Sequence, residues 1–114
     1  MHELAVTKNI INIVVDFAEK ENAIKVNSIN LVIGDLTQII DDSVQFYFDF
    51  LSKGTVCEGA KLVFERIAAV CRCEKCEKEF EFKAGHFECP YCEDGLGILT
   101  EKGTEFFIKS IDVD

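Results

Sequence analysis

Basic residues are scarce in this sequence of 114 residues: 12 Lys and Arg stand against 21 Asp and Glu, which gives a formal net charge of -9. No basic cluster occurs at any point along the chain. Affinity for nucleic acids comes mainly from Lys and Arg side chains that neutralise phosphates. DNA and RNA are therefore not expected as partners.

Long hydrophobic runs are also missing, because the apolar stretches are far shorter than the roughly 20 residues that span a bilayer. The start, Met-His-Glu, has neither the positive charge nor the apolar stretch of a secretory signal. Internal repeats and low-complexity linkers are absent from the sequence. We expect a cytoplasmic protein without a membrane segment. In that compartment paired cysteines indicate a metal more often than a disulfide.

Apolar residues, by contrast, are plentiful: they make up 48% of the chain and include ten Phe. This composition is typical of a packed globular protein and not of a disordered one. At this length we expect one hydrophobic core with a small appended module.

Two segments have the apolar spacing that predicts helices. The first spans residues 4–21, with Thr7 on its polar face. The second follows Asp42, because Asp42 and Gln45 resemble a capping box, and Gly54 is its expected C-terminal stop. The apolar positions are Val6, Ile10, Ile13, Val14, Phe17 and Ala18 in the first helix and Val44, Phe46, Tyr47, Phe48 and Leu51 in the second.

Three segments predict strands: residues 27–33, residues 61–67 and residues 105–113. Gly34 ends the first of them. Alternation along the last strand puts Phe107, Ile111 and Val113 on one side and Phe106 and Ile108 on the other.

The order of these elements predicts an α+β fold, with two helices on a small three-stranded sheet. Residues 1–68 and 103–114 would build this domain. Residues 69–102, which hold most of the cysteines, would form an inserted, zinc-ribbon-like module.

Four cysteines in that module form two Cys-x-x-Cys pairs, Cys73 with Cys76 and Cys89 with Cys92. Zinc prefers four such ligands in a tetrahedron, and four thiolates close its coordination shell, so the site would be structural and not catalytic. A segment this short also needs a metal or disulfides to fold. Iron in a rubredoxin-like site is the alternative.

Three further residues have metal-binding or nucleophilic side chains without a clear partner in the sequence. Cys71 lies next to the first pair, but its Cys-x-Cys spacing fits a zinc knuckle poorly. His86 is expected to be a solvent-facing loop residue, and Cys57 a small, partly buried one. An enzyme with Cys57 or Cys71 as nucleophile would need a base, and no histidine is convincingly placed for that role.

The N-terminus offers a second metal site, although a histidine near a chain end is more often simply exposed. The α-amine of Met1, the amide nitrogen of His2 and the imidazole of His2 can close chelate rings around one ion. Nitrogen-rich, roughly planar donors suit nickel(II) or copper(II) better than zinc. A further donor would come from the Glu3 amide or from a carboxylate that the fold brings near.

The chain resembles the HypA/HybF family of hydrogenase maturation nickel chaperones over essentially its full length. Order and spacing of several short segments carry the resemblance, whereas none of them is specific alone. They are Met1-His2-Glu3-Leu4, Ile33-Gly34-Asp35-Leu36, Thr55 with Glu58-Gly59-Ala60, the two cysteine pairs, and residues 105–112.

The resemblance implies weak, transferable Ni(II) binding through His2 and the neighbouring backbone. It also implies delivery, with a partner GTPase of the HypB type, to the large subunit of a [NiFe] hydrogenase; a homodimer is left open. Glu3 would support the nickel site and a partner contact. In some members a carboxylate after the first strand completes the nickel shell, where this chain has Ile40; Asp41 is the preferred substitute, ahead of Asp42.

A different class of function shares the cysteine spacing. A zinc-ribbon adaptor in transcription or translation would keep the four-cysteine module but make no use of His2. The use of His2 therefore distinguishes the two hypotheses.

Overall fold

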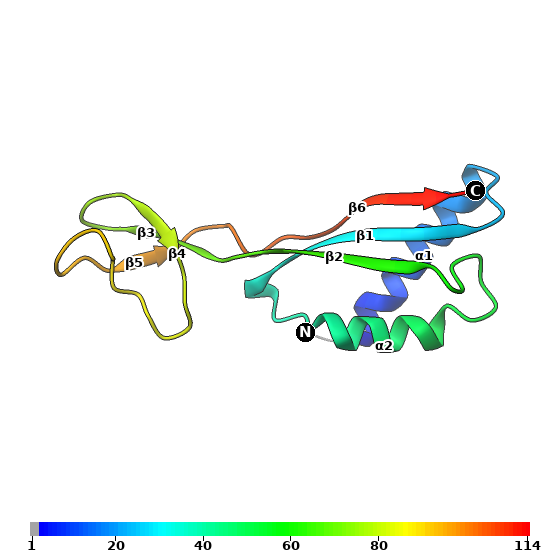
Figure 1. Ribbon diagram of the computed structural model, residues 1–114, viewed down its shortest axis with the longest axis horizontal. Coiled ribbons are helices and arrows are strands. Elements are labelled where there is room, and N and C mark those ends of the chain that lie inside the picture. The colour runs from blue at the N-terminus through cyan, green and yellow to red at the C-terminus, as the bar shows by residue number, and fades with distance from the viewer. Residues whose placement is uncertain (1–2) are drawn as a thin grey trace.

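The computed structural model describes residues 3–114, and Met1 and His2 lie outside the described part. The molecule is elongated, with extents of 57 × 23 × 16 Å, and each end has its own sheet (Figure 1). We call residues 3–68 and 103–114 the main domain and residues 69–102 the cysteine module. The elements are α1 (Glu3–Lys20), β1 (Val26–Gly34), a 3-10 turn (Asp35–Thr37), α2 (Asp41–Leu51), β2 (Lys61–Ile67), β3 (Val70–Cys73), β4 (Glu79–Glu81), β5 (Gly97–Leu99) and β6 (Phe106–Val113).

The main sheet has the strand order β2-β1-β6, which confirms the predicted three-stranded sheet. β1 pairs with β2 in parallel and with β6 antiparallel. Parallel neighbours need a crossover, and α2 supplies it. Helices α1 and α2 pack against each other and share one buried cluster with alternate residues of the strands. Its fully buried members include Ile10, Val14, Ile29, Leu31 and Phe48.

The buried face of α1 differs from the prediction at three positions, one of which is Ile11, buried although it was not assigned to the apolar face. Thr7 is fully buried, whereas Ile13 is 56% exposed. The Thr7 hydroxyl donates a hydrogen bond of 2.6 Å to the carbonyl oxygen of Glu3, which removes the cost of burying it. Ile13 lies instead on the rim of a groove between α1 and the edge strand β6.

Helix α2 begins two residues earlier than predicted, and the expected capping box is wrong. Ile40 occupies the N-cap position, and its side chain makes no capping hydrogen bond. Gln45 donates to Asp49 instead, over 2.8 Å. Asp41 and Asp42 both lie in the first turn, where carboxylates interact favourably with the helix dipole. The helix ends at Leu51, before Gly54.

The predicted sides of β6 are also wrong. Phe106 and Ile108 pack into the same core as Ile111 and Val113, while Phe107 is 48% exposed. The cause is a register shift against β1, which leaves one extra residue in β6 and resets the alternation. The pairs on either side of the shift are Asn30 with Ser110 and Leu31 with Ile108, so Lys109 is the extra residue.

The cysteine module contains the small antiparallel sheet β4-β3-β5. Its buried cluster consists of only Cys71, Cys73, Phe80 and Cys89. Gly97 is required beside them, because a Cβ atom there would lie 2.7 Å from the Cβ of Cys71 and 2.5 Å from the Phe80 ring. Three of the four buried residues are cysteines, so the module has little apolar core of its own.

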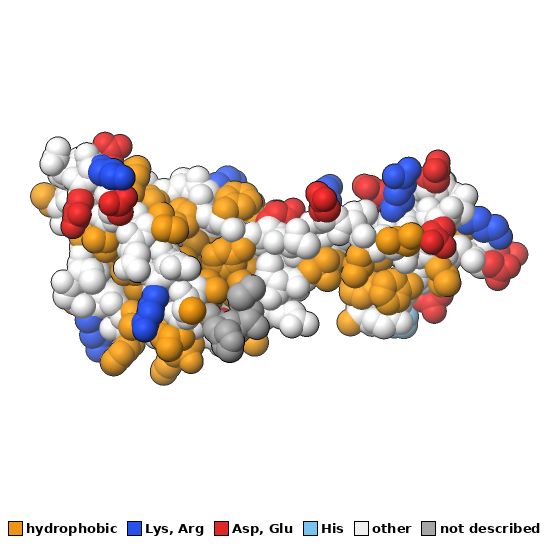
Figure 2. Space-filling view, turned by 180° about the vertical axis from the view of Figure 1, so that it is seen from behind, with side chains coloured by type: hydrophobic (Ala, Val, Ile, Leu, Met, Phe, Trp, Pro, Cys, Tyr) orange, Lys and Arg blue, Asp and Glu red, His pale blue; other side chains and the backbone are white. Residues whose placement is uncertain are grey.

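Figure 2 shows hydrophobic side chains on the surface of both ends of the molecule, with acidic residues prominent around the cysteine module. The large exposed apolar residues of the cysteine module include Phe87, Leu96 and Ile98. Among the described residues, no helix has the length and apolar character needed to cross a membrane.

Candidate functional site

The four cysteines predicted to bind a metal come together in one cluster. Their Sγ atoms all lie within 4.8 Å of one another. The Sγ atoms of Cys73 and Cys92 are 3.6 Å apart, as are those of Cys76 and Cys89. Zinc at about 2.3 Å from four tetrahedral sulfurs would put neighbouring sulfurs about 3.8 Å apart. The donor set and its spacing therefore fit a metal ion such as zinc.

Backbone N–H groups point at the sulfurs from both pairs. Cys73 Sγ accepts from the N–H of Lys75 at 3.3 Å and of Cys76 at 3.5 Å. Cys89 Sγ accepts from the N–H of Tyr91 at 3.4 Å. These bonds arise because each Cys-x-x-Cys segment turns tightly around its first sulfur. They favour the thiolate form, which is the form that binds a metal.

The thiols differ sharply in acidity. The N–H of Cys76, supported by that of Lys75, lowers the pKa of Cys73 to about 6, although burial acts in the opposite direction. Burial raises the pKa of Cys92 to about 12, and the neighbouring thiols raise it further. Thiolates in contact repel one another, so the charge of one hinders ionisation of the next. A bound divalent cation would compensate these charges.

Gly95 is a residue of this site that the sequence analysis missed. A Cβ atom at this position would lie 2.5 Å from the Sγ of Cys92 and 2.6 Å from that of Cys73. Its carbonyl oxygen also accepts the N–H of Cys89 at 2.9 Å. The signal in the sequence is a glycine shortly after the second pair.

The remaining thiols and His86 lie outside the cluster. Cys71 and Cys57 are completely buried, and burial raises the pKa of both. A buried thiol with a raised pKa is a poor nucleophile, which argues against the cysteine-enzyme alternative. His86 is 73% exposed, with Nδ1 3.8 Å from the carboxylate of Glu88.

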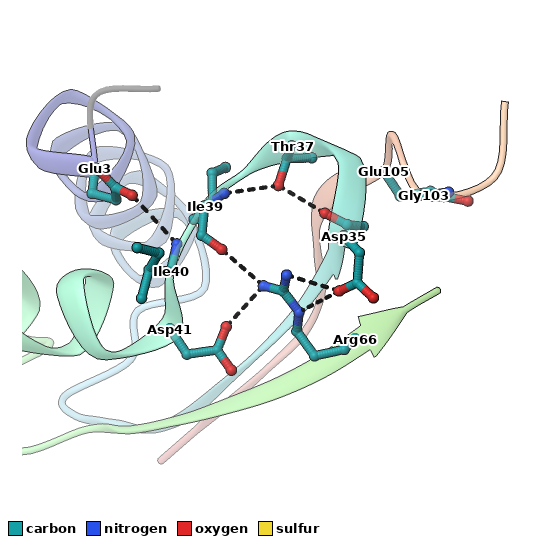
Figure 3. Close-up of polar contacts among 10 residues, drawn as sticks. Glu3, Asp35, Thr37, Ile39, Ile40, Asp41, Arg66, Gly103 and Glu105 are labelled. Atoms are coloured by element: carbon teal, nitrogen blue, oxygen red, sulfur yellow. Dashed lines mark hydrogen bonds and ion pairs between the residues drawn. The ribbon is translucent and has the colours of Figure 1, made fainter. Parts of the chain in front are cut away.

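At the other end of the molecule, Glu3 opens α1 and contacts the loop between β1 and α2 (Figure 3). Its Oε2 accepts the backbone N–H of Ile40 at 3.3 Å. Met1 and His2, the other predicted nickel donors, lie outside the described residues, so their role stays a prediction. The contact places the start of the described chain beside the segment that holds Asp41 and Asp42.

Asp41 is paired with Arg66 of β2, which the sequence analysis did not single out. Nη1 of Arg66 donates to Asp41 Oδ1 and to the carbonyl oxygen of Ile39, both at 2.9 Å. Its Nε and Nη2 reach Asp35 Oδ1 at 3.0 and 2.9 Å. Ile39, Ile40, Asp41, Asp42 and Arg66 line a shallow hollow of about 360 Å³.

The sequence matches the family model described as "Hydrogenase/urease nickel incorporation, metallochaperone, hypA" over residues 1–113. Similar curated proteins are the hydrogenase maturation factors HypA of Caldanaerobacter subterraneus subsp. tengcongensis, 46% identical, and of Dehalococcoides mccartyi, 42% identical. Both alignments cover 100% of this chain, and they cover 100% and 95% of the respective relatives.

The fold is also that of solved HypA structures. The solution structure of the nickel metallochaperone HypA from Helicobacter pylori has a TM-score of 0.64 at 23% identity, covering 99% of this chain and 97% of that one. A second HypA solution structure has a TM-score of 0.68, also at 23% identity, and covers 99% and 96%. Full-length family match, close relatives and four-cysteine cluster agree, and the chain belongs to the HypA family of nickel metallochaperones for hydrogenase maturation.

Proposed function

We propose that this protein carries Ni(II) at its N-terminus and, with a partner GTPase, delivers it to the large subunit of a [NiFe] hydrogenase. Family membership supports this proposal, and the contact between Glu3 and Ile40 supports the location of the site. In this proposal the protein is a carrier and not an enzyme, and zinc in the four-cysteine cluster serves a structural role.

The donors in this proposal are the Met1 amine together with the amide and imidazole nitrogens of His2. The sequence nominated two carboxylates in addition, Glu3 and Asp41, but in the structure Oδ1 of Asp41 is paired with Arg66. A site on a chain end suits a carrier, because the ion can be released without unfolding a buried cage. Since the imidazole must be neutral and the amide deprotonated, acid should release the nickel.

Titration of the untagged protein with Ni(II) tests the proposal. Replacing His2 by Ala removes one donor, and extending the N-terminus by one residue displaces the amine. Each change should weaken nickel binding at least about tenfold, the loss expected when a metal site is disrupted. His86→Ala is the matched control, because it removes the other histidine, 73% exposed in the cysteine module, and should leave the affinity unchanged.

Equal nickel affinity of the wild type, His2→Ala and the extended protein would exclude the N-terminal site. Delivery is tested separately in a nickel-dependent hydrogenase maturation assay. His2→Ala should fail to support maturation. Full activity of this variant would instead favour the zinc-ribbon adaptor.

A further inference from the structure

One guanidinium group holds the loop between β1 and α2 in place. Arg66 projects from β2 and bonds three groups of this loop, which are the carboxylates of Asp35 and Asp41 and the carbonyl oxygen of Ile39 (Figure 3). All of these bonds are 2.9 to 3.0 Å long. Arginine suits this task because its planar fork carries five N–H donors.

Side-chain hydrogen bonds support the backbone of this loop at several points. Gln38 adopts a left-handed conformation, with φ of 62°. Thr37 helps locally: its hydroxyl donates to the Gly34 carbonyl at 2.8 Å and accepts the Ile39 N–H at 3.2 Å. The Ile39 carbonyl and the peptide that follows it are held by Arg66.

That peptide links Arg66 to Glu3. The carbonyl of Ile39 and the N–H of Ile40 belong to the same planar peptide unit and point in opposite directions. Arg66 bonds the carbonyl, so it fixes the orientation in which the N–H of Ile40 reaches the Glu3 carboxylate. If the peptide rotated, both bonds would be lost together.

Glu3 is also fixed from within its own helix. Its carbonyl oxygen accepts the hydroxyl of the fully buried Thr7 at 2.6 Å. The side chain of Glu3 is therefore tied to the loop, and its main chain to the core of α1. His2 precedes Glu3 directly in the sequence, so the two bonds determine where the chain leaves the described part.

We propose that Arg66 is a positioning residue of the nickel site and that Asp41 is its anchor and not a nickel donor. This inference rests on the proposed function. Arg66 holds the peptide of Ile39 and Ile40, this peptide holds Glu3, and Glu3 directly follows the two residues that carry the proposed donors. Asp41 already carries a cation on Oδ1, and repulsion between guanidinium and Ni(II) disfavours a second cation on the same carboxylate.

Isothermal titration of the untagged full chain with Ni(II) provides the test. Arg66→Gln should weaken nickel binding about 10- to 100-fold, the loss typical when a group that orients metal ligands is removed. Arg66→Lys keeps the charge but not the fork, and should be nearly as weak. Asp41→Asn keeps an oxygen that accepts from Arg66, and should bind nickel almost as well as the wild type.

Glu65→Gln is the matched control. Glu65 neighbours Arg66 on β2 and has an ion pair of its own, with Lys109 at 3.2 Å. Breaking that pair should leave nickel affinity unchanged, because it does not touch the loop.

Hydrogen exchange distinguishes positioning from general destabilisation. In Arg66→Gln the Ile40 amide should exchange faster, whereas the Ser52 amide, which bonds Phe48 at the far end of α2, should keep its wild-type rate.

Wild-type nickel affinity in both Arg66 variants would overturn the positioning role. A loss in Asp41→Asn as large as in His2→Ala would make Asp41 a donor. If His2→Ala itself binds nickel normally, the proposed function fails first, so the two failures are distinguishable.

Discussion

Cys76→Ser should release the metal ion and unfold the cysteine module while the main domain stays folded. The buried cluster of the module has only four members, Cys71, Cys73, Phe80 and Cys89. This is too little apolar surface to offset the entropy of ordering 34 residues, from 69 to 102. Binding of a structural zinc ion supplies about 10 kcal/mol or more in comparable small domains. Without its fourth sulfur, most of that free energy is lost.

Metal content per chain and the amide spectrum of the variant measure this effect. Signals from residues 69–102 should lose their dispersion, and those of the main domain should keep it because that domain has its own buried cluster. Cys71→Ala is the control: Cys71 is buried more deeply than Cys76 but does not belong to the four-cysteine metal cluster, so one metal ion per chain should remain. A Cys76→Ser protein that is folded and holds one metal ion per chain would contradict the prediction. A coloured, iron-containing wild type would show that the bound metal is iron and not zinc.

The features that the sequence predicted well depend on local spacing. The cysteine pairs are each closed by a turn of four residues, so Cys73 with Cys76 and Cys89 with Cys92 were readable as metal ligands before any fold was known. The helices and strands of the main domain likewise follow from the period of their apolar residues.

The features that were missed depend on contacts between distant segments. Arg66 looked like any charged strand residue, since its partners Asp35 and Asp41 lie 31 and 25 positions away. Thr7 was assigned to the polar face because its bond to the Glu3 carbonyl is invisible in a hydrophobic pattern. The extra residue Lys109 in β6 changes which side chains face the core, and simple alternation does not reveal it.

Gly34 is another residue whose role the sequence did not reveal. It lies where two segments of backbone cross. Gly34 closes β1, and its N–H donates to the carbonyl oxygen of Glu105 at 2.7 Å. The N–H of Leu36 donates to the carbonyl oxygen of Gly103 at 2.8 Å. These bonds join the end of β1 to the segment that returns from the cysteine module. The same crossing leads directly into Asp35, one of the anchors of Arg66.

Gly34→Ala should destabilise the main domain by about 3 kcal/mol, which corresponds to a fall in Tm of roughly 10 °C for a chain of this size. Its φ of -79° suits any residue, so glycine is not needed for conformational freedom. It is needed for space: a Cβ atom would lie 2.7 Å from the Cα of Gly103 and closer still to its carbonyl group. Because these neighbours are backbone, the two segments must separate and lose both hydrogen bonds.

Thermal unfolding of Gly34→Ala beside Gly54→Ala separates crowding from backbone strain. Gly54 has φ of 79° and nothing within 4 Å of an added Cβ, so its substitution introduces strain alone and should cost about 1 kcal/mol. Equal losses in the two variants would show that the close crossing of the two backbones contributes no stability. If the crossing matters as the contacts indicate, Gly34→Ala should also speed exchange of the Leu36 amide, because its acceptor at Gly103 moves away. Asp35, which is next to Gly34 and bonds Arg66, would then shift together with the crossing. Nickel binding should therefore weaken in Gly34→Ala but not in Gly54→Ala.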